Sequence, residues 1–419
     1  MERMKYPAVH WVDGMKISKR EFSALENYLM DQLRDALSVT LTDYNYGLLP
    51  APETGRDALS VEVSAERIEL NYCRAVTRAG ARIEVIDQDH QALRRSVKEM
   101  MGNFDFSHAQ EWYVALKVDA FTRVPFGEIS MDTHRQLYTI PQYEIIIIPK
   151  EQSPSGQFAP FAIPIAKLRN SVGGVEQIKN YIPPCTSLRV SPELLRIHQR
   201  IEQDLSEVLR KATIIVRKVN YRNQREKITA LAADIAQVAQ QTMTFLNQHY
   251  DTYRLILPHQ PPLLFIEYFA RFARTVDTSL ELTRGKDDML NYFQQYVQNF
   301  NYNEFSTSIQ HMTSALMYNH LEIRQSLDRV ENLIAHVKNL FEGLDRLNYE
   351  QLPQFDIIVN VQPWQQNQGG NRLNPNQQMP VPPPIQAPGG GKVKINPRGR
   401  DGNPGGGGQD PNNPFGFNE

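Results

Sequence analysis

The sequence predicts an α+β multidomain protein. It has an N-terminal antiparallel β-sandwich or barrel-like domain with one long helix, then an α-helical bundle, then a disordered Pro/Gly-rich tail. Apolar residues recur at every second position between residues 59 and 168, and at steps of three and four from residue 194 onward. The two regions meet at Tyr181-Ile182-Pro183-Pro184-Cys185. Because two adjacent prolines fix φ and remove two backbone donors, neither a sheet nor a helix continues through this point.

The first predicted domain, residues 1–185, begins with a long helix. Ser18 and Glu21 have the spacing of a capping box. The apolar residues after them fall on one helical face: Phe22, Leu25, Leu29, Leu33 and Leu37. Gly, Pro and Asn then separate candidate strands at residues 59–64, 67–74, 81–86, 112–121, 143–148 and 163–168. Residues 87–101 fit either a short helix or an extended excursion.

The second predicted domain, residues 186–350, is a helical bundle. Ser191-Pro192-Glu193 supplies an N-cap, a proline at the first helical position and an acid in the first turn. The seam of this helix runs through Leu194, His198, Ile201, Leu205, Val208, Ala212, Ile215 and Val219. A second helix follows to Ile256 and ends at the prolines near residue 260, and an aromatic helix and a short helical piece come next.

The last helical stretch covers residues 304–347. As one straight helix it would be roughly 65 Å long. Such a long periodic pattern favours coiled-coil association, within the chain or between copies. We expect a single copy to bury only part of these seams, and therefore a homotrimer.

The C-terminal composition predicts a disordered tail over residues 361–419, after a possible short strand within residues 351–360. Eleven prolines and twelve glycines occur in these 59 residues, so the segment cannot bury a core. Isolated apolar and proline-rich positions remain as candidate docking sites: Trp364, Pro382, Pro383, Pro384, Phe415 and Phe417. We expect three such tails on a trimer to bind an envelope partner weakly but multivalently.

Composition limits the class of protein. A length of 419 residues indicates two or three domains, and a net charge of −2 gives no reason to expect nucleic-acid binding. The longest aliphatic run, residues 145–148, is far too short to span a membrane, so we expect a cytoplasmic protein with no direct membrane insertion. Cys73 and Cys185 are the only cysteines and are expected to be small buried apolar residues.

No motif for catalysis, cofactor binding or metal binding is found in the sequence. His198 and His249 lie on helical seams, where a packed histidine is more common than a metal ligand. His311 and His320 are nine residues apart on the predicted long helix and lie off-register. We therefore predict no catalytic residue, cofactor site or metal site, and a non-enzymatic protein.

Four short motifs, in order along the chain, resemble the TssK family of type VI secretion baseplate proteins. The first is Val9-His10-Trp11-Val12-Asp13-Gly14-Met15, with Phe22 a short way downstream. Tyr44-Asn45-Tyr46-Gly47 is similar to the family's aromatic-Gly segment, and Pro164-Ile165-Ala166-Lys167-Leu168 to its last strand. Tyr181-Ile182-Pro183-Pro184-Cys185 is similar to the junction that leads into the family's helical domain.

The resemblance implies a trimeric structural adaptor that binds baseplate wedge proteins of the TssF/TssG type and connects them to an inner-membrane or envelope complex. The chain departs from the family in two places. Lys19-Arg20-Glu21-Phe22 keeps only the aromatic residue of the family's Arg-Pro-x-His-Phe segment. After Leu347 the sequence shows no pattern for the family's folded C-terminal head, so a divergent envelope partner is the natural inference.

The candidate wedge interface is Trp11, Met15 and Phe22, because tryptophan is favoured at interface hot spots and Trp11 adjoins an Asp-Gly turn. An equally weighted alternative is that Trp11 packs beneath the first helix. The candidate hinge is Ile182, Pro183, Pro184 and Cys185. Two other functions stay open at this stage: a phage-tail or fibre-like structural trimer, and a hydrolase or ligand-binding enzyme, which a polar pocket with converging His and acidic side chains would favour.

Overall fold

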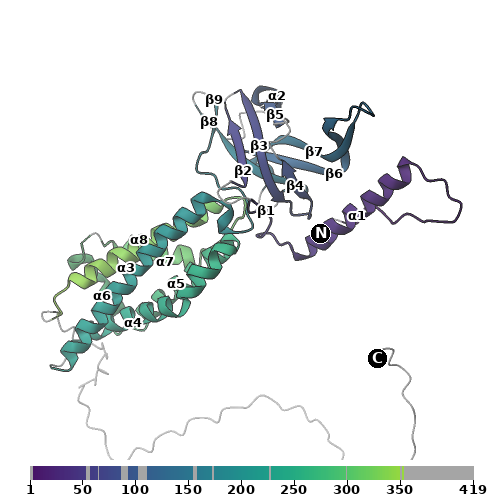
Figure 1. Ribbon diagram of the computed structural model, residues 1–419. Helices are drawn as coiled ribbons and strands as arrows, with labels where there is room; N and C mark the ends of the chain where they lie inside the picture. The colour runs from purple at the N-terminus through teal and green to yellow at the C-terminus, as the bar shows by residue number, and fades with distance from the viewer. Residues whose placement is uncertain are drawn as a thin grey trace, which may run out of the picture. The chain divides into compact units, whose positions relative to one another are not determined.

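The computed structural model describes residues 3–52, 57–64, 66–85, 93–101, 111–153, 158–171, 174–225, 228–298, 300–349 and 352. All of them belong to one compact unit, Met1–Ile358. The predicted boundary at residue 185 therefore lies inside this unit. The described residues combine antiparallel sheets with α-helices, which confirms the α+β prediction (Figure 1).

The strands form two antiparallel sheets. The first is arranged on β3 (Arg67–Val76), which pairs with β1 (Gly47–Leu48), β2 (Leu59–Val63), β4 (Arg82–Val85) and β5 (Leu93–Ser96). The second has the order β7-β6-β8-β9, with β6 (Glu111–Ile129), β7 (Gln136–Pro149), β8 (Ala162–Ser171) and β9 (Gly174–Gln177). Buried side chains of both sheets, such as Leu70 and Val114, belong to one core. Each predicted strand overlaps an observed one within the described residues, with different bounds, and β5 with α2 (Val97–Met101) occupies the described part of residues 87–101.

Strands β6 and β7 are longer than predicted. Beyond a bulge between Asp119 and Arg123 they continue as a two-stranded ribbon, residues 122–141, which we call the β6–β7 arm. Pro125, Gly127 and Pro141 lie in it. These residues are ordinarily read as breakers, but a two-stranded ribbon tolerates them because its strands each have one unpaired edge.

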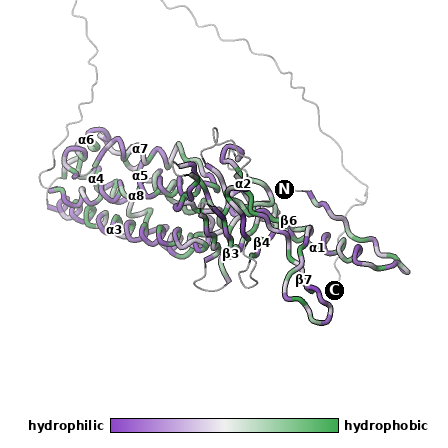
Figure 2. The backbone as a smooth tube through the Cα atoms, turned by 90° about the horizontal axis from the view of Figure 1, so that it is seen from above, coloured by the Kyte–Doolittle hydropathy of each residue, from purple (hydrophilic) through white to green (hydrophobic). Residues whose placement is uncertain are grey.

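The helices after the sheets are α3 (Pro192–Asn223), α4 (Ala230–Asp251), α5 (Pro262–Glu281), α6 (Lys286–Tyr296), α7 (Tyr302–Thr313) and α8 (Ile323–Arg346). Short helical turns flank them: η4 (Leu188–Val190), η5 (Thr252–Ile256) and η6 (Leu257–His259). Another, η2 (Lys150–Gln152), follows β7 in the second sheet. The hydropathy colouring in Figure 2 alternates along these helices. The predicted start of α3 is confirmed, because the hydroxyl of Ser191 accepts a hydrogen bond from Leu194 N–H.

The prediction of one straight helix over residues 304–347 is wrong. The helix is interrupted between Thr313 and Ile323. In this break Asn319 forms a local turn, with its side-chain oxygen accepting from Leu321 N–H at 2.9 Å. His320 and Glu322 are thereby directed toward the sheets, so His311 and His320 do not share a helix.

The apolar seams of α3 and α8 are buried within a single copy of the chain. Val330 and Val337 on α8 are completely buried, as are Val208 and Ile215 on α3. Thr242 on α4 is also buried. The expectation that one copy buries only part of its seams is therefore wrong for these residues, and a trimer needs another apolar surface.

The Pro-Pro segment is a packed junction in this structure. Leu48 N–H donates to the carbonyl oxygen of Pro184 at 2.8 Å, and Thr186 N–H donates back to Leu48 at 3.0 Å. Ile182, Pro184 and Cys185 are buried, while Pro183 is half-buried. A side chain at Gly47 would meet Pro184 O at 2.1 Å, so this close approach requires glycine.

A partly buried ionic cluster joins the second sheet to the start of α8. Glu322 accepts hydrogen bonds from the hydroxyl of Tyr113 at 2.5 Å and from Lys167 at 2.7 Å. Lys167 also lies 2.9 Å from Glu111, which pairs with Lys150. Burial alone would raise the pKa of Glu111, but its hydrogen bonds with Lys150 and Lys167 outweigh this and lower it. Because every charge in the cluster has a partner, its burial is tolerated.

His320 adds a pH-sensitive contact at the same junction. Its Nε2 lies 2.9 Å from the carbonyl oxygen of Tyr46, and its Nδ1 lies 2.7 Å from the hydroxyl of Tyr318. The first contact requires a proton on Nε2, so the neutral ring donates to Tyr46 and accepts from Tyr318. Burial lowers the pKa of His320 from 6.5 to about 4.

We predict that the stability of the fold falls between pH 6.5 and about 4, the window set by the unfolded and folded pKa values of His320. In that window the unfolded chain binds a proton that the folded chain excludes, so acid favours unfolding. Between pH 7.5 and pH 5, the urea concentration at the midpoint of unfolding should fall less for His320→Gln than for the wild type. An equal loss in both proteins would show that His320 does not contribute.

Candidate functional site

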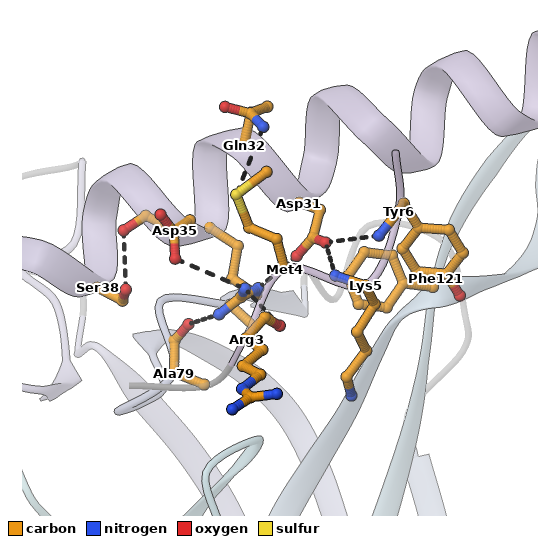
Figure 3. A network of polar contacts seen from close by, with 12 residues as sticks. Arg3, Met4, Lys5, Tyr6, Asp31, Gln32, Asp35, Ser38, Ala79 and Phe121 are labelled. Atoms are coloured by element: carbon orange, nitrogen blue, oxygen red, sulfur yellow. Dashed lines mark hydrogen bonds and ion pairs between the residues drawn. The ribbon is translucent and has the colours of Figure 1, made fainter. Parts of the chain in front are cut away.

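Helix α1 (Lys19–Thr40) is capped as the sequence predicts. Ser18 and Glu21 form the complete capping box, with Ser18 N–H donating to the Glu21 carboxylate at 2.8 Å. The side chain that packs deepest on this helix is charged: Asp31 is fully buried and accepts hydrogen bonds from the backbone N–H groups of Lys5 and Tyr6 (Figure 3). Burial alone would raise the pKa of Asp31, but these bonds and the bond from Arg34 lower it.

Arg34 completes the buried polar face of α1. Its Nε lies 2.8 Å from Asp31, and its Nη1 donates to the carbonyl oxygen of Ala79 at 3.1 Å. Ser38 lies on the same face and is also buried. At Gly80, where φ is +84°, an added Cβ would lie 2.2 Å from Arg34 O, so the backbone of this turn lies directly against α1.

Most of the apolar face of α1 is consequently turned to the surface, although Leu25 on this face is half-buried. We call Phe22, Leu29, Leu33 and Leu37 the outer row; they are 57, 50, 62 and 47% exposed. An amphipathic helix ordinarily buries this face against the core. Here the Asp31–Arg34 pair takes that place, and the outer row is left as an apolar patch of the kind that marks protein interfaces.

The segment before α1 extends this surface. Trp11 is 45% exposed and Ile17 is 55% exposed, so the indole does not lie buried beneath the helix. Met15 is half-buried, and its N–H closes the Asp13-Gly14 turn on Val12. The structure thus places the candidate residues Trp11 and Phe22 at the surface and Met15 at its edge. Their contact with a partner stays a prediction.

A groove that the sequence did not indicate lies beside α1, at the base of the β6–β7 arm. Its volume is about 520 Å³, and we call it the arm groove. Its apolar lining consists of Met30, Val85, Leu93, Val124, Phe126 and Ile140. Arg82, Glu84, Gln142 and Tyr143 supply its polar atoms, and Pro141 also lines it. The signal that could have revealed it is the continuation of alternating apolar residues through the arm.

A polar hollow between α7 and α8 gathers His311, His336, Glu304 and Ser308 within about 300 Å³. This is the arrangement that would favour a hydrolase. However, the Ser308 hydroxyl donates to Phe305 O at 2.7 Å, and His336 lies 3.7 Å from Glu304, a carboxylate that is itself mostly exposed. A nucleophile hydrogen-bonded to a base is therefore not formed by these side chains.

The other candidate residues have structural surroundings. His198 is buried, stacks on Tyr253 and contacts its carbonyl oxygen at 3.0 Å, as expected for a packed seam residue. Cys73 and Cys185 are buried free thiols, and burial raises the pKa of each to about 12. Within the described ranges, no group of three or more His, Cys, Asp or Glu is placed to hold a metal.

The candidate tail residues Trp364, Pro382, Pro383, Pro384, Phe415 and Phe417 lie outside the described residues, as does the possible strand at residues 355–359. No helix among the residues that the structure describes is long and apolar enough to cross a membrane.

The chain is similar to solved structures of type VI secretion baseplate proteins. One is the crystal structure of TssK, at 14% identity and a TM-score of 0.46 over 80% of this chain and 69% of that chain. Another is from the TssK-TssF-TssG baseplate subcomplex, at 14% identity and a TM-score of 0.38 over 82% of this chain and all of that one. A third is from the type VI baseplate complex, at 15% identity and a TM-score of 0.42 over 81% of this chain and all of that one. No protein-family model and no curated protein matches the chain.

We predict that Asp31→Ala destabilises the protein by about 3 kcal/mol, because it leaves the Arg34 guanidinium buried beside an empty position. Urea unfolding would measure the loss. Asp35→Ala is the matched control, since Asp35 lies 3.9 Å from Arg34 but is 37% exposed. Equal effects of the two substitutions would contradict the role assigned to the buried pair.

Proposed function

We propose that this protein is a non-enzymatic structural adaptor of a type VI secretion baseplate, which connects wedge proteins to a trans-envelope membrane complex. The observation that carries the proposal is the inverted packing of α1, with the outer row exposed and Asp31 and Arg34 buried. An apolar row held outward by a buried ion pair favours assembly with other chains.

The sequence motifs agree with this interpretation at the positions where they fall. The motif at residues 164–168 lies in β8, and the motif at 181–185 is the packed junction between the last strand and α3. The motif at residues 9–15 leads directly into the exposed surface of Trp11 and α1. The resemblance that these motifs carry therefore maps onto ordered features of the chain.

In the proposed assembly the protein is a cytoplasmic homotrimer at the inner face of the envelope. Wedge proteins of the TssF/TssG type bind the segment from Trp11 to Phe22. The tail tethers the trimer to an envelope complex through short apolar and proline-rich anchors. The proposal involves no chemical reaction.

The wedge contact is tested by Trp11→Ala. Because a half-exposed tryptophan can anchor an interface, its loss should weaken binding of wedge proteins more than about tenfold. Binding would be measured by interferometry with purified wedge proteins from the same genome, with Leu255→Ala as control, since Leu255 is 59% exposed in the helical part. Wild-type affinity in Trp11→Ala would refute the contact, and a failure of that variant to fold would instead favour a packing role.

A further inference from the structure

A basic pocket lies where α3 and α8 end, and we call it the end pocket. Its volume is about 600 Å³. Lys218, Arg222 and Arg225 line it, and none of the described residues that line it is acidic. The adjacent carboxylate of Asp345 accepts a hydrogen bond from Lys218 at 2.9 Å and another from Lys211 at 3.0 Å. Because two lysines share this one carboxylate, the pocket keeps an excess of positive charge.

Arg225 is placed to bind a carboxylate. Its guanidinium lies over the ring of Tyr221, 4.3 Å from the ring centroid. No carboxylate among the described residues pairs with it. A guanidinium stacked on a ring keeps its N–H groups in its own plane, so it can still donate two hydrogen bonds to one carboxylate. Tyr221 is 56% exposed and Leu347 is half-buried, so both offer apolar surface beside this cation. The end pocket therefore suits a partner that carries both carboxylates and aromatic rings.

The tail of the same chain carries its charges in two blocks. All five basic residues of the segment 361–419 precede residue 401, and all three acidic residues lie at position 401 or after it. Phe415 and Phe417 are the only aromatic residues of this segment after Trp364. Residues 410–419, which lie outside the described residues, thus combine two carboxylates with two aromatic rings and have no basic side chain.

The tail also leaves the fold at the end pocket. Tyr349 lines the pocket, and Phe415 follows it 66 positions later in the chain. A flexible linker of this length has a root-mean-square span of about 45 Å. Its far end is then present near its origin at an effective concentration on the order of 1 mM. Even a contact of millimolar affinity would be half occupied without a second molecule.

We propose that residues 410–419 dock in the end pocket of the same chain, with a carboxylate on Arg225 and a phenylalanine ring against Tyr221 and Leu347. The occupant is this segment because its charge is opposite to that of the pocket, whereas like charge excludes the basic block of the tail. The contact goes beyond the proposed adaptor function and does not depend on it. If the tail is also the envelope tether, the pocket and the envelope partner compete for Phe415 and Phe417.

The contact is tested in the full chain by attaching a benzophenone maleimide to the variant Asn418→Cys. Cys73 and Cys185 are not labelled, because both are buried and have a pKa of about 12. After irradiation we expect a product with the mass of one chain on a denaturing gel, and cross-linked peptides that map to residues 218–225 and 347–349. Added Arg225→Glu should lower this yield more than about fivefold, because it removes a charge-assisted pair of hydrogen bonds. Added Arg196→Glu is the control, since Arg196 is 73% exposed at the other end of α3.

Two further variants separate docking from a folding defect. Phe415→Ser/Phe417→Ser should lower the yield although it lies outside the compact unit. Arg225→Glu combined with Asp410→Arg/Glu419→Arg should restore the yield, because the charges of both partners are exchanged.

Cross-links spread evenly over the surface, an equal yield at the pocket in the labelled chain with and without Arg225→Glu, or cross-links found only in dimers would each overturn the inference. The measurement needs no wedge protein or envelope complex, so its failure is distinct from a failure of the proposed function.

Discussion

The buried pair of Asp31 and Arg34 is the constraint on which the surface of this protein depends. Three residues apart on α1, the two side chains satisfy each other and also bind backbone groups of residues 5, 6 and 79. Separating the two side chains would leave a buried charge without its ion pair, which is costly. The helix therefore cannot rotate to bury its leucines instead. The close approach of Gly80 fixes the same orientation from the sheet side. The exposed outer row is therefore a consequence of what is buried beneath it.

A second constraint operates at the junction between the sheets and the helices. The break between α7 and α8 directs Glu322 to Tyr113 and Lys167, and His320 to Tyr46. These contacts join positions more than 150 residues apart, and the Pro184 segment closes on Leu48 beside them. A long continuous helix could not supply them, since both side chains come from the non-helical turn. The break between α7 and α8 thus replaces backbone hydrogen bonds of a continuous helix with side-chain contacts between the helices and the sheets.

Much of the fold could be predicted because its determinants are local. The capping box at Ser18, the cap at Ser191 and the period-two strands act over a few residues. Periodicity reveals that α1 has an apolar face but not which way it points, since that depends on Arg34 reaching Ala79 in a distant turn. The helix break has no Gly or Pro and follows from tertiary contacts of His320 and Glu322. The arm groove depends in the same way on β4, β6 and α1 meeting in space. The exposed position of Trp11 likewise required the structure.

The central claim is that the outer row is an interface between chains. The most direct test is the solution mass of the full chain by multi-angle light scattering, compared with the Leu29→Asp/Leu33→Asp variant. We predict about three times the chain mass of 48.1 kDa for the wild type at micromolar concentration and a single chain mass for the variant, with unchanged circular dichroism. The variant should dissociate because it would bury unpaired carboxylates in an apolar contact. A monomeric wild type, or a variant that keeps the wild-type mass, would contradict the claim.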